Sequence, residues 1–268
     1  MKPLRIIVGL KPVPDPKRWG EITLDPITKT LQRDCIPSVI DPLGKNALEE
    51  ALKIREAHSG SVVVMSMAPP NTEAILTEAL CIGADAAVLL SDRAFAGADT
   101  LATSYVLSQG IKKLGEYDLV LCGSRSLDGG TAQVGPQLAE FLGIPHITRV
   151  TRVELRGDDS VRVEAKLDSG RQVVDTQLPA LLTVEKEINV PRLKCLLGIL
   201  QARDKSLRVW NAVDLGVDLA CVGAAGSPTR VADVYTVAMK RRAEVITGPP
   251  DEVATLLAEK LRTLGFLP

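Results

Sequence analysis

The residues best suited to chemistry lie in a glycine-rich stretch between an apolar run and a helical pattern. The stretch covers residues 123–136 (GSRSLDGGTAQVGP) and follows the apolar run YDLVLC at residues 117–122. Its glycines let a backbone approach a phosphate or ribose closely, and Thr131 and Gln133 bring neutral donors to a helix start that favours anions. It carries no catalytic nucleophile. The pattern predicts a nucleotide-holding loop, and a glycine-rich turn without a ligand is the alternative.

The elements that must position this loop alternate between strands and helices in the first half of the chain. Apolar runs predict buried strands at residues 5–10, 61–66, 87–90, 117–122 and 181–184. Periodic segments predict helices at roughly residues 44–57, 72–82, 98–114 and 131–142, with Asp41 as a cap and Pro42 in the first turn. This order is typical of a doubly wound, mostly parallel (Rossmann-like) α/β sheet, which binds ligands at the carboxyl ends of its strands.

The pattern changes in the second half of the chain. Alternating polar and apolar residues from about 148 to 177 predict an antiparallel meander. Residues 185–230 have weak periodicity and predict an extended C-terminal arm that packs on another chain. We therefore expect a nucleotide-binding or flavin-binding α/β domain over 1–184, a docking arm over 185–230, and a C-terminal segment over 231–268 with an amphipathic helix at 251–264.

Composition limits the possible partners and metals. Lys and Arg number 32 against 33 Asp and Glu, so the net charge of −1 gives no electrostatic reason to expect nucleic acid or an anionic membrane as a partner. The five cysteines have no C-x-x-C spacing, which argues against a disulfide framework and against a zinc or iron–sulfur site. No signal peptide or membrane span is expected from the sequence, so a cytoplasmic location is predicted.

Several separated motifs together resemble one family. They are KPVPD at residues 11–15, Asp41-Pro42 followed by ALEEAL at 47–52, GAD at 83–85, the 123–136 stretch, LPA at 178–180, and Pro191-Arg192. On these motifs the chain resembles, from end to end, the beta subunit of electron-transfer flavoprotein. The resemblance implies a heterodimer with an alpha subunit that carries electrons on flavin.

The resemblance extends to two designs within the family. In the ordinary carrier the beta subunit holds structural AMP, whereas in the electron-bifurcating type it holds a second FAD at that place. The segment SDRAFAGADTLATS at residues 91–104 is similar to the bifurcating type. Gly97 and Thr100 precede a helix whose start could receive the pyrophosphate of FAD, which AMP lacks. The alternative is a helix that is merely capped by a hydroxyl group.

The resemblance also implies which residues surround the nucleotide. Gly9 and Gly44 would leave room for it. Asp128 would either accept from a ribose hydroxyl or cap its own turn, and Arg125 would either contact phosphate or the flavin or be an ordinary surface residue. The full set is Gly9, Lys11, Asp41, Pro42, Leu43, Gly44, Met67, Thr100, Thr103, Gly123, Ser124, Arg125, Ser126, Leu127, Asp128, Gly129, Gly130, Thr131, Ala132, Gln133 and Val134.

The implied activity belongs to a complex rather than to this chain alone. By resemblance, NADH would reduce the flavin held here, one electron would pass to ferredoxin or flavodoxin, and the other would pass to the alpha-subunit FAD and a dehydrogenase. Leu196 matches a leucine that docks dehydrogenases, while Gln201 and Asp204 replace the lysines of the ordinary carrier and predict a different dehydrogenase partner. A stand-alone nucleotide hydrolase or dehydrogenase is disfavoured, because neither G-x-G-x-x-G after the first strand nor G-x-x-x-x-G-K-[ST] occurs.

Overall fold

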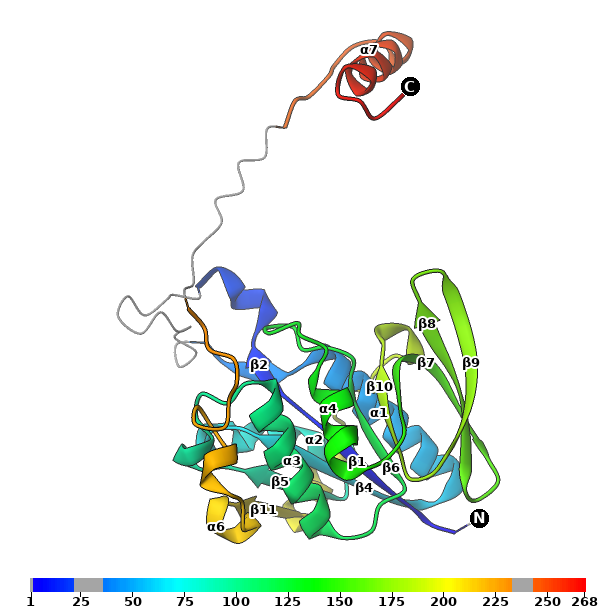
Figure 1. The fold of residues 1–268 in the computed structure, drawn as a ribbon. Coiled ribbons are helices and arrows are strands. Elements are labelled where there is room, and N and C mark those ends of the chain that lie inside the picture. The colour runs from blue at the N-terminus through cyan, green and yellow to red at the C-terminus, as the bar shows by residue number, and fades with distance from the viewer. Residues whose placement is uncertain (1, 22–35, 233–242) are drawn as a thin grey trace. The chain divides into compact units, whose positions relative to one another are not determined.

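The computed structural model describes residues 2–21, 36–232 and 243–268, and the chain divides into two units at residue 232. The first unit is built on a nine-stranded sheet in the order β11-β5-β4-β1-β6-β10-β7-β8-β9 (Figure 1). The parallel strands are β1 (Leu4–Gly9), β4 (Gly60–Met67), β5 (Ala86–Leu90), β6 (Leu119–Gly123), β10 (Ala180–Val184), β7 (His146–Arg156) and β11 (Ser206–Trp210). The doubly wound, mostly parallel sheet predicted from the sequence is confirmed.

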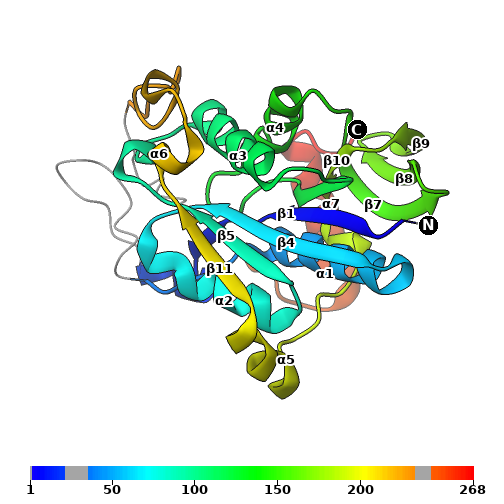
Figure 2. The ribbon, with the colours of Figure 1, turned by 90° about the horizontal axis from the view of Figure 1, so that it is seen from below.

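Helices cover both faces of the parallel strands (Figure 2). One layer contains α1 (Pro42–His58) and α2 (Glu73–Ile82), and the other contains α3 (Thr100–Leu114) and α4 (Val134–Leu142). Because both faces are covered, strands such as β10 (ALLTV) are buried along their whole length, which explains their continuous apolar runs. The four helices predicted for this half of the chain are all present, with bounds that differ by a few residues.

The predicted antiparallel meander is also present. Strand β7 pairs with β8 (Ser160–Leu167), and β8 pairs with β9 (Gly170–Gln177), both antiparallel. The exposed residues of β9 make it an edge with one solvated face, which explains its alternating pattern. A short two-stranded sheet of β2 (Pro12–Pro14) and β3 (Ser38–Ile40) was not predicted, because three residues are too few to show a period.

The segment predicted to be an irregular arm, residues 185–230, contains more regular structure than expected. It contains α5 (Leu196–Gln201), α6 (Ala212–Leu215) and β11, which pairs with β5 over five residues and so extends the sheet of the first unit. The expected separation from the preceding domain is therefore incomplete. The sequence carries only a weak signal for strand β11. This strand lies at the edge of the sheet, pairs with β5 alone, and does not alternate strictly between buried and exposed residues.

The first part of this segment is fastened to α1. The guanidinium of Arg192 donates to the carboxylates of Glu49, at 2.8 and 3.1 Å, and of Glu56, at 2.5 and 3.0 Å. Three residues earlier, the side-chain amide of Asn189 donates to the Asn46 carbonyl and to the Glu50 carboxylate. The hydrogen bonds that Arg192 donates to Glu56 and Glu49 raise the pKa of Arg192, and burial opposes that shift. Docking on another chain remains a prediction for the residues beyond this fastening.

The second unit contains α7 (Pro250–Thr263), and the amphipathic terminal helix predicted from the sequence is confirmed. Pro249 precedes the helix and Pro250 is its first residue. At these positions a backbone N–H would have no partner within the helix, so proline costs no helical hydrogen bond. Helix α7 exposes Leu256 and Leu257, and the turn that follows it exposes Leu264, Phe266 and Leu267.

Candidate functional site

The candidate site lies where the strand order of the sheet reverses. Strand β1 has β4 on one side and β6 on the other, and Gly9 at the end of β1 pairs with Cys122 near the end of β6. In open α/β sheets the crevice at such a switch point, beyond the carboxyl ends of the strands, is where ligands bind. The glycine-rich loop leaves β6 at this point and leads into α4.

Asp41 ties the loop to the start of α1. Its carboxylate caps the helix by accepting from the Leu43 N–H at 3.0 Å, and its other oxygen accepts from the Leu127 N–H at 2.7 Å. The predicted helix opening, with Asp41 at the cap and Pro42 in the first turn, is confirmed. Burial raises the pKa of the Asp41 carboxyl above its ordinary value, although the backbone donors oppose that shift.

Lys11 and Asp128 form a second tie across the loop. The Lys11 ammonium donates to Asp128 at 2.6 Å and to the Ser126 hydroxyl at 3.2 Å. The Asp128 side chain is 2% exposed, whereas that of Lys11 is 45% exposed. Burial opposes ionisation of Asp128, but the hydrogen bond and charge of Lys11, with the Ser126 and Gly129 donors, outweigh it and lower the carboxyl pKa.

The structure shows one of the two roles considered for Asp128. Its carboxylate accepts from the Gly129 N–H at 2.7 Å, so it caps the local turn. The Gly130 N–H donates to the Ser126 carbonyl at 3.0 Å, and Gly130 has a φ of 63°, which favours glycine. These two N–H groups therefore stabilise the loop itself. Acceptance of a ribose hydroxyl by Asp128 remains a prediction.

Other small residues of the site are explained by packing. A Cβ at residue 123 would lie 2.7 Å from the Cβ of Leu43, so Gly123 permits the close approach of β6 and α1. Gly44 is buried, and a Cβ there would lie 3.3 Å from the Leu10 side chain. This packing alone explains why residue 44 is a glycine. Room for a nucleotide at Gly44 remains a prediction.

The start of α3 meets the far end of the loop. The Thr100 hydroxyl donates to the Gln133 side-chain oxygen at 3.0 Å, and the Ser104 hydroxyl donates to the Val134 carbonyl at 3.2 Å. The segment at residues 91–104 therefore adjoins the loop. Asp99 caps α3 by accepting from the N–H groups of Leu101 and Ala102, so its carboxylate occupies the place considered for a pyrophosphate.

The remaining predicted residues are dispersed around this crevice. Met67 and Thr103 are half-buried, at the end of β4 and in the first turn of α3. Ser124 is buried and its N–H donates to the Val184 carbonyl. The exposed loop residues include Arg125, Thr131 and Ala132, and Arg125 makes no hydrogen bond or ion pair within the described ranges.

Sequence reasoning missed the Lys11–Asp128 pair and the part played by Asp99. An aspartate directly before Thr100 is a helix-cap signal that could have identified Asp99. The Lys11–Asp128 pair spans 117 positions, and no local pattern reveals it.

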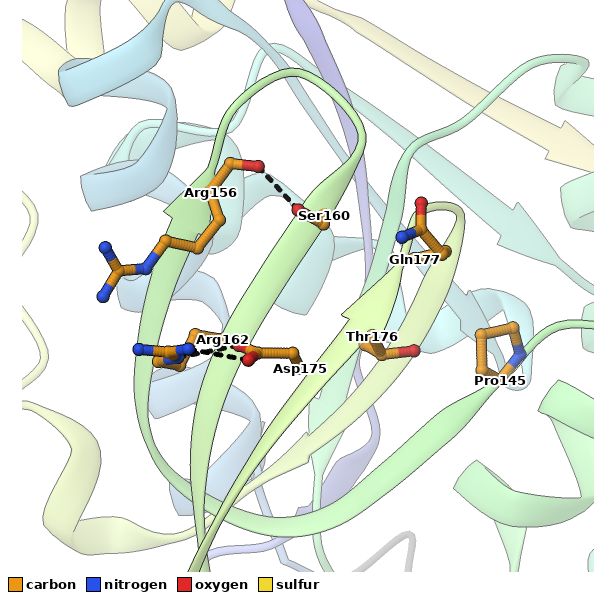
Figure 3. Close-up of a pocket in the computed structure, with 7 residues that line it drawn as sticks. All are labelled: Pro145, Arg156, Ser160, Arg162, Asp175, Thr176 and Gln177. Carbon is orange, nitrogen blue, oxygen red and sulfur yellow. Dashed lines mark hydrogen bonds and ion pairs between the residues drawn. The ribbon is translucent and has the colours of Figure 1, made fainter.

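One hollow of the described residues lies elsewhere, on the antiparallel meander (Figure 3). It has a volume of about 700 Å³ and is lined by Pro145, Arg156, Ser160, Arg162, Asp175, Thr176 and Gln177. Arg162 is already engaged with Asp175 through two hydrogen bonds of 2.7 Å. None of the residues proposed for the nucleotide lines this hollow.

An apolar surface is present at the predicted docking residue. Leu196 is 74% exposed, and Leu193, Leu197 and Leu200 are exposed beside it in sequence. Helix α5 packs on α2 through Gly198, where a Cβ would lie 2.1 Å from the carbonyl oxygen of Cys81. The leucines therefore remain on the surface while the glycine makes the close contact.

Metal-ligating clusters and membrane-spanning helices are both absent from the described part of the chain. Within residues 2–21, 36–232 and 243–268, no three His, Cys, Asp or Glu side chains gather in a way that could hold a metal ion. The same ranges contain no helix with the length and apolar character needed to cross a membrane.

The sheet, its switch point and the glycine-rich loop define an α/β protein of the Rossmann-like class, in which ligands bind beyond the carboxyl ends of the strands at such a switch point. The electron transfer flavoprotein domain family model matches residues 28–215. The chain is 47% identical over 264 residues to the electron transfer flavoprotein subunit beta of Clostridium acetobutylicum, covering 98% of this chain and 100% of the relative.

Two other relatives extend the comparison. The caffeyl-CoA reductase-Etf complex subunit CarD of Acetobacterium woodii is 43% identical over 261 residues, covering 97% of this chain and 98% of the relative. Protein FixA of Azorhizobium caulinodans is 41% identical over 252 residues, covering 91% and 88%. The chain belongs to the electron transfer flavoprotein family as a beta subunit, the class that pairs with an alpha subunit in electron transfer.

Proposed function

We propose that this beta subunit works in flavin-based electron bifurcation in the cytoplasm. In this proposal NADH is the electron donor, and ferredoxin or flavodoxin and a dehydrogenase are the two acceptors. The observation that carries it is the contact between Thr100 and Gln133, because it joins the 91–104 segment to the glycine-rich loop. Because that segment resembles the bifurcating type, a second FAD would lie against both the segment and the loop.

The residues of the crevice suit the polar parts of an adenine nucleotide. The Lys11–Asp128 pair and Asp41 hold the loop in place through groups that are buried or partly buried, so that little ordering remains for binding. Exposed side chains at Arg125, Thr131 and Gln133 are available as donors. When bound, the flavin supplies the electron-transfer chemistry. The protein side chains bind and orient it.

A second candidate function is the ordinary carrier, in which the same crevice holds AMP. One observation favours this carrier: the Asp99 carboxylate accepts hydrogen bonds from the N–H groups at the start of α3. The pyrophosphate of FAD would have to compete with that carboxylate for these N–H groups, whereas AMP has no pyrophosphate. The two candidates therefore differ in what occupies the space beside α3.

Cofactor analysis of the heterodimer decides between them. The chain is co-expressed with its alpha subunit, and the cofactors released from the purified complex are quantified by mass analysis and visible spectrum. Two FAD per heterodimer are expected. One FAD and one AMP would exclude the bifurcating assignment and establish the ordinary carrier in its place.

A loop variant links the cofactor to this crevice. We expect Gly129→Val to lower nucleotide content in this subunit, because the added side chain meets the Ser126 hydroxyl and Lys11 at the mouth of the loop. Gly20→Val is the matched control, since a Cβ at Gly20 meets nothing within 4 Å. Full nucleotide content in a folded Gly129→Val protein would show that the loop is not the binding element.

A further inference from the structure

Residues 222–229, which we name the strap, lie across the loop that precedes α3. Val222 and Ser227 are buried, and the Ala224 N–H donates to the Ala96 carbonyl at 3.0 Å. The Ser227 hydroxyl donates to the Gly223 carbonyl at 2.7 Å and accepts from the Asp99 N–H at 2.8 Å. The strap is therefore docked through both apolar and polar contacts.

The fit between strap and loop depends on two glycines. Gly223 has a φ of 55°, and a Cβ there would lie 2.0 Å from the Ala94 carbonyl oxygen. Across the same contact, a Cβ on Gly97 would lie 3.2 Å from the Ala224 Cβ. Because the backbones meet this closely, the strap has one well-defined docked position.

One carboxylate joins the strap to α3. One oxygen of Asp99 accepts from the Thr229 hydroxyl at 2.7 Å and from its N–H at 3.1 Å, and the other accepts from Leu101 and Ala102. Burial raises the Asp99 carboxyl pKa, but the donors from Thr229, Ala102 and Leu101 outweigh it, and the net shift is downward. The carboxylate therefore stays ionised and accepts from both sides at neutral pH.

The first turns of α3 also contact the nucleotide loop. Thr100 donates to Gln133, and the Ser104 hydroxyl, whose shortest acceptor is the Thr100 carbonyl at 2.7 Å, lies 3.2 Å from the Val134 carbonyl. The strap, the start of α3 and the end of the loop thus form a continuous set of hydrogen bonds.

We propose that docking of the strap is coupled to nucleotide occupancy of the 123–134 loop through Asp99. The proposal rests on the proposed function only in requiring an adenine nucleotide, FAD or AMP, at this loop. A nucleotide that fixes Gln133 also fixes Thr100 and the first turn of α3, which presents its N–H groups to Asp99. A fixed Asp99 then holds Thr229. Coupling is reciprocal, so a docked strap raises nucleotide affinity by the same factor.

Hydrogen exchange on the heterodimer tests this coupling. Exchange is measured in the nucleotide-depleted complex and after adding FAD or AMP, for peptides covering the loop and the strap. We expect slower exchange in both. Thr229→Val removes the hydroxyl donor and keeps the side-chain shape, so nucleotide affinity should fall about fivefold or more and strap exchange should no longer respond to nucleotide.

The controls separate coupling from simple loss of structure. Thr229→Ser retains the hydroxyl and should restore the response of the strap. Thr255→Val removes a hydroxyl that donates to the Asp251 carbonyl in α7, and should change neither affinity nor strap exchange. The coupling would be overturned if nucleotide slowed exchange in the loop but not in the strap, and if Thr229→Val bound nucleotide with unchanged affinity. The nucleotide site would then still stand. Absence of protection in the loop itself would overturn the nucleotide site, and the coupling with it.

Discussion

At the scale of single residues, the Lys11–Asp128 pair decides how firmly the loop is held. Asp128 is almost completely buried, and Lys11 is its charged partner at 2.6 Å. Removing one partner of a buried pair leaves the other charge uncompensated, which costs more than the pair contributes. The exposure of Lys11 reduces that cost, because water can partly replace it.

We therefore expect Lys11→Met to lower the unfolding free energy by about 1–2 kcal/mol at pH 7. Because folding lowers the Asp128 pKa, its contribution is present above the unfolded pKa, about 3.9, and is lost as pH falls through the folded value. Urea unfolding between pH 3 and pH 7 measures this. Asp128→Asn should flatten the acid side of the profile, and an unchanged profile in that variant would contradict the assignment.

Gly123 and Gly129 stand in the same loop but should respond differently to a methyl group. Gly123→Ala places a Cβ 2.7 Å from that of Leu43, and we expect a loss of about 1–3 kcal/mol from overpacking. Gly129→Ala meets only the flexible ends of Ser126 and Lys11, at 3.3 and 3.7 Å, and should leave stability nearly unchanged. Thermal unfolding of the two variants compares them directly, and equal losses would argue against the close approach of β6 and α1.

At the scale of elements, α1 owes part of its fixed position to Arg192. The Glu49 side chain is 6% exposed and depends on this guanidinium for compensation. We expect Arg192→Ala to lower the unfolding free energy by about 3 kcal/mol, because it strands a buried carboxylate. Arg162→Ala is the matched control: it also breaks a two-bond pair, with Asp175, but on the exposed meander, where the loss should be small. Denaturant titration of both variants measures the difference, and similar values would contradict a special cost of burial at Glu49.

The parallel strands and their helices could be predicted because their burial imposes long apolar runs and regular periods. The cap at Asp41 could be predicted for the same reason, since it is a local feature of two adjacent residues. Strand β11 could not, because Ser206–Trp210 gains its place from pairing with β5, some 120 positions earlier in the chain. The contact between Asp99 and Thr229 joins residues 130 positions apart, and such contacts leave no local pattern.

At the scale of the whole molecule, the exposed apolar residues point to partner chains. Leucines 193, 196, 197 and 200 are exposed in the first unit, and α7 exposes its own apolar residues in the second. Clustered exposure of large apolar side chains is typical of interaction sites. By the family resemblance, Gln201 and Asp204 stand where the ordinary carrier has lysines, so we expect a different dehydrogenase partner.

If this surface docks the dehydrogenase of the proposed function, Leu196→Ser should weaken that docking by roughly tenfold or more, as loss of a central apolar contact does. Nucleotide content and the unfolding free energy should stay unchanged, because the side chain is 74% exposed. Surface plasmon resonance with the heterodimer measures the affinity. The control is Leu167→Ser, an exposed leucine on the meander, and an equal effect of both substitutions would contradict a docking role for α5.

The path of residues 186–210 has a consequence for synthesis of the chain. This segment bonds to α1 through Asn189 and Arg192, crosses α2 at Gly198, and joins the sheet beside β5. A nascent chain makes Glu49 143 residues before the arginine that compensates it. At roughly 5–20 residues per second, that interval lasts on the order of ten seconds. Throughout it, an acidic helix face emerges from the ribosome without its counterion, and α1 reaches its final stability only after about seven-tenths of the protein has been made, 192 of 268 residues.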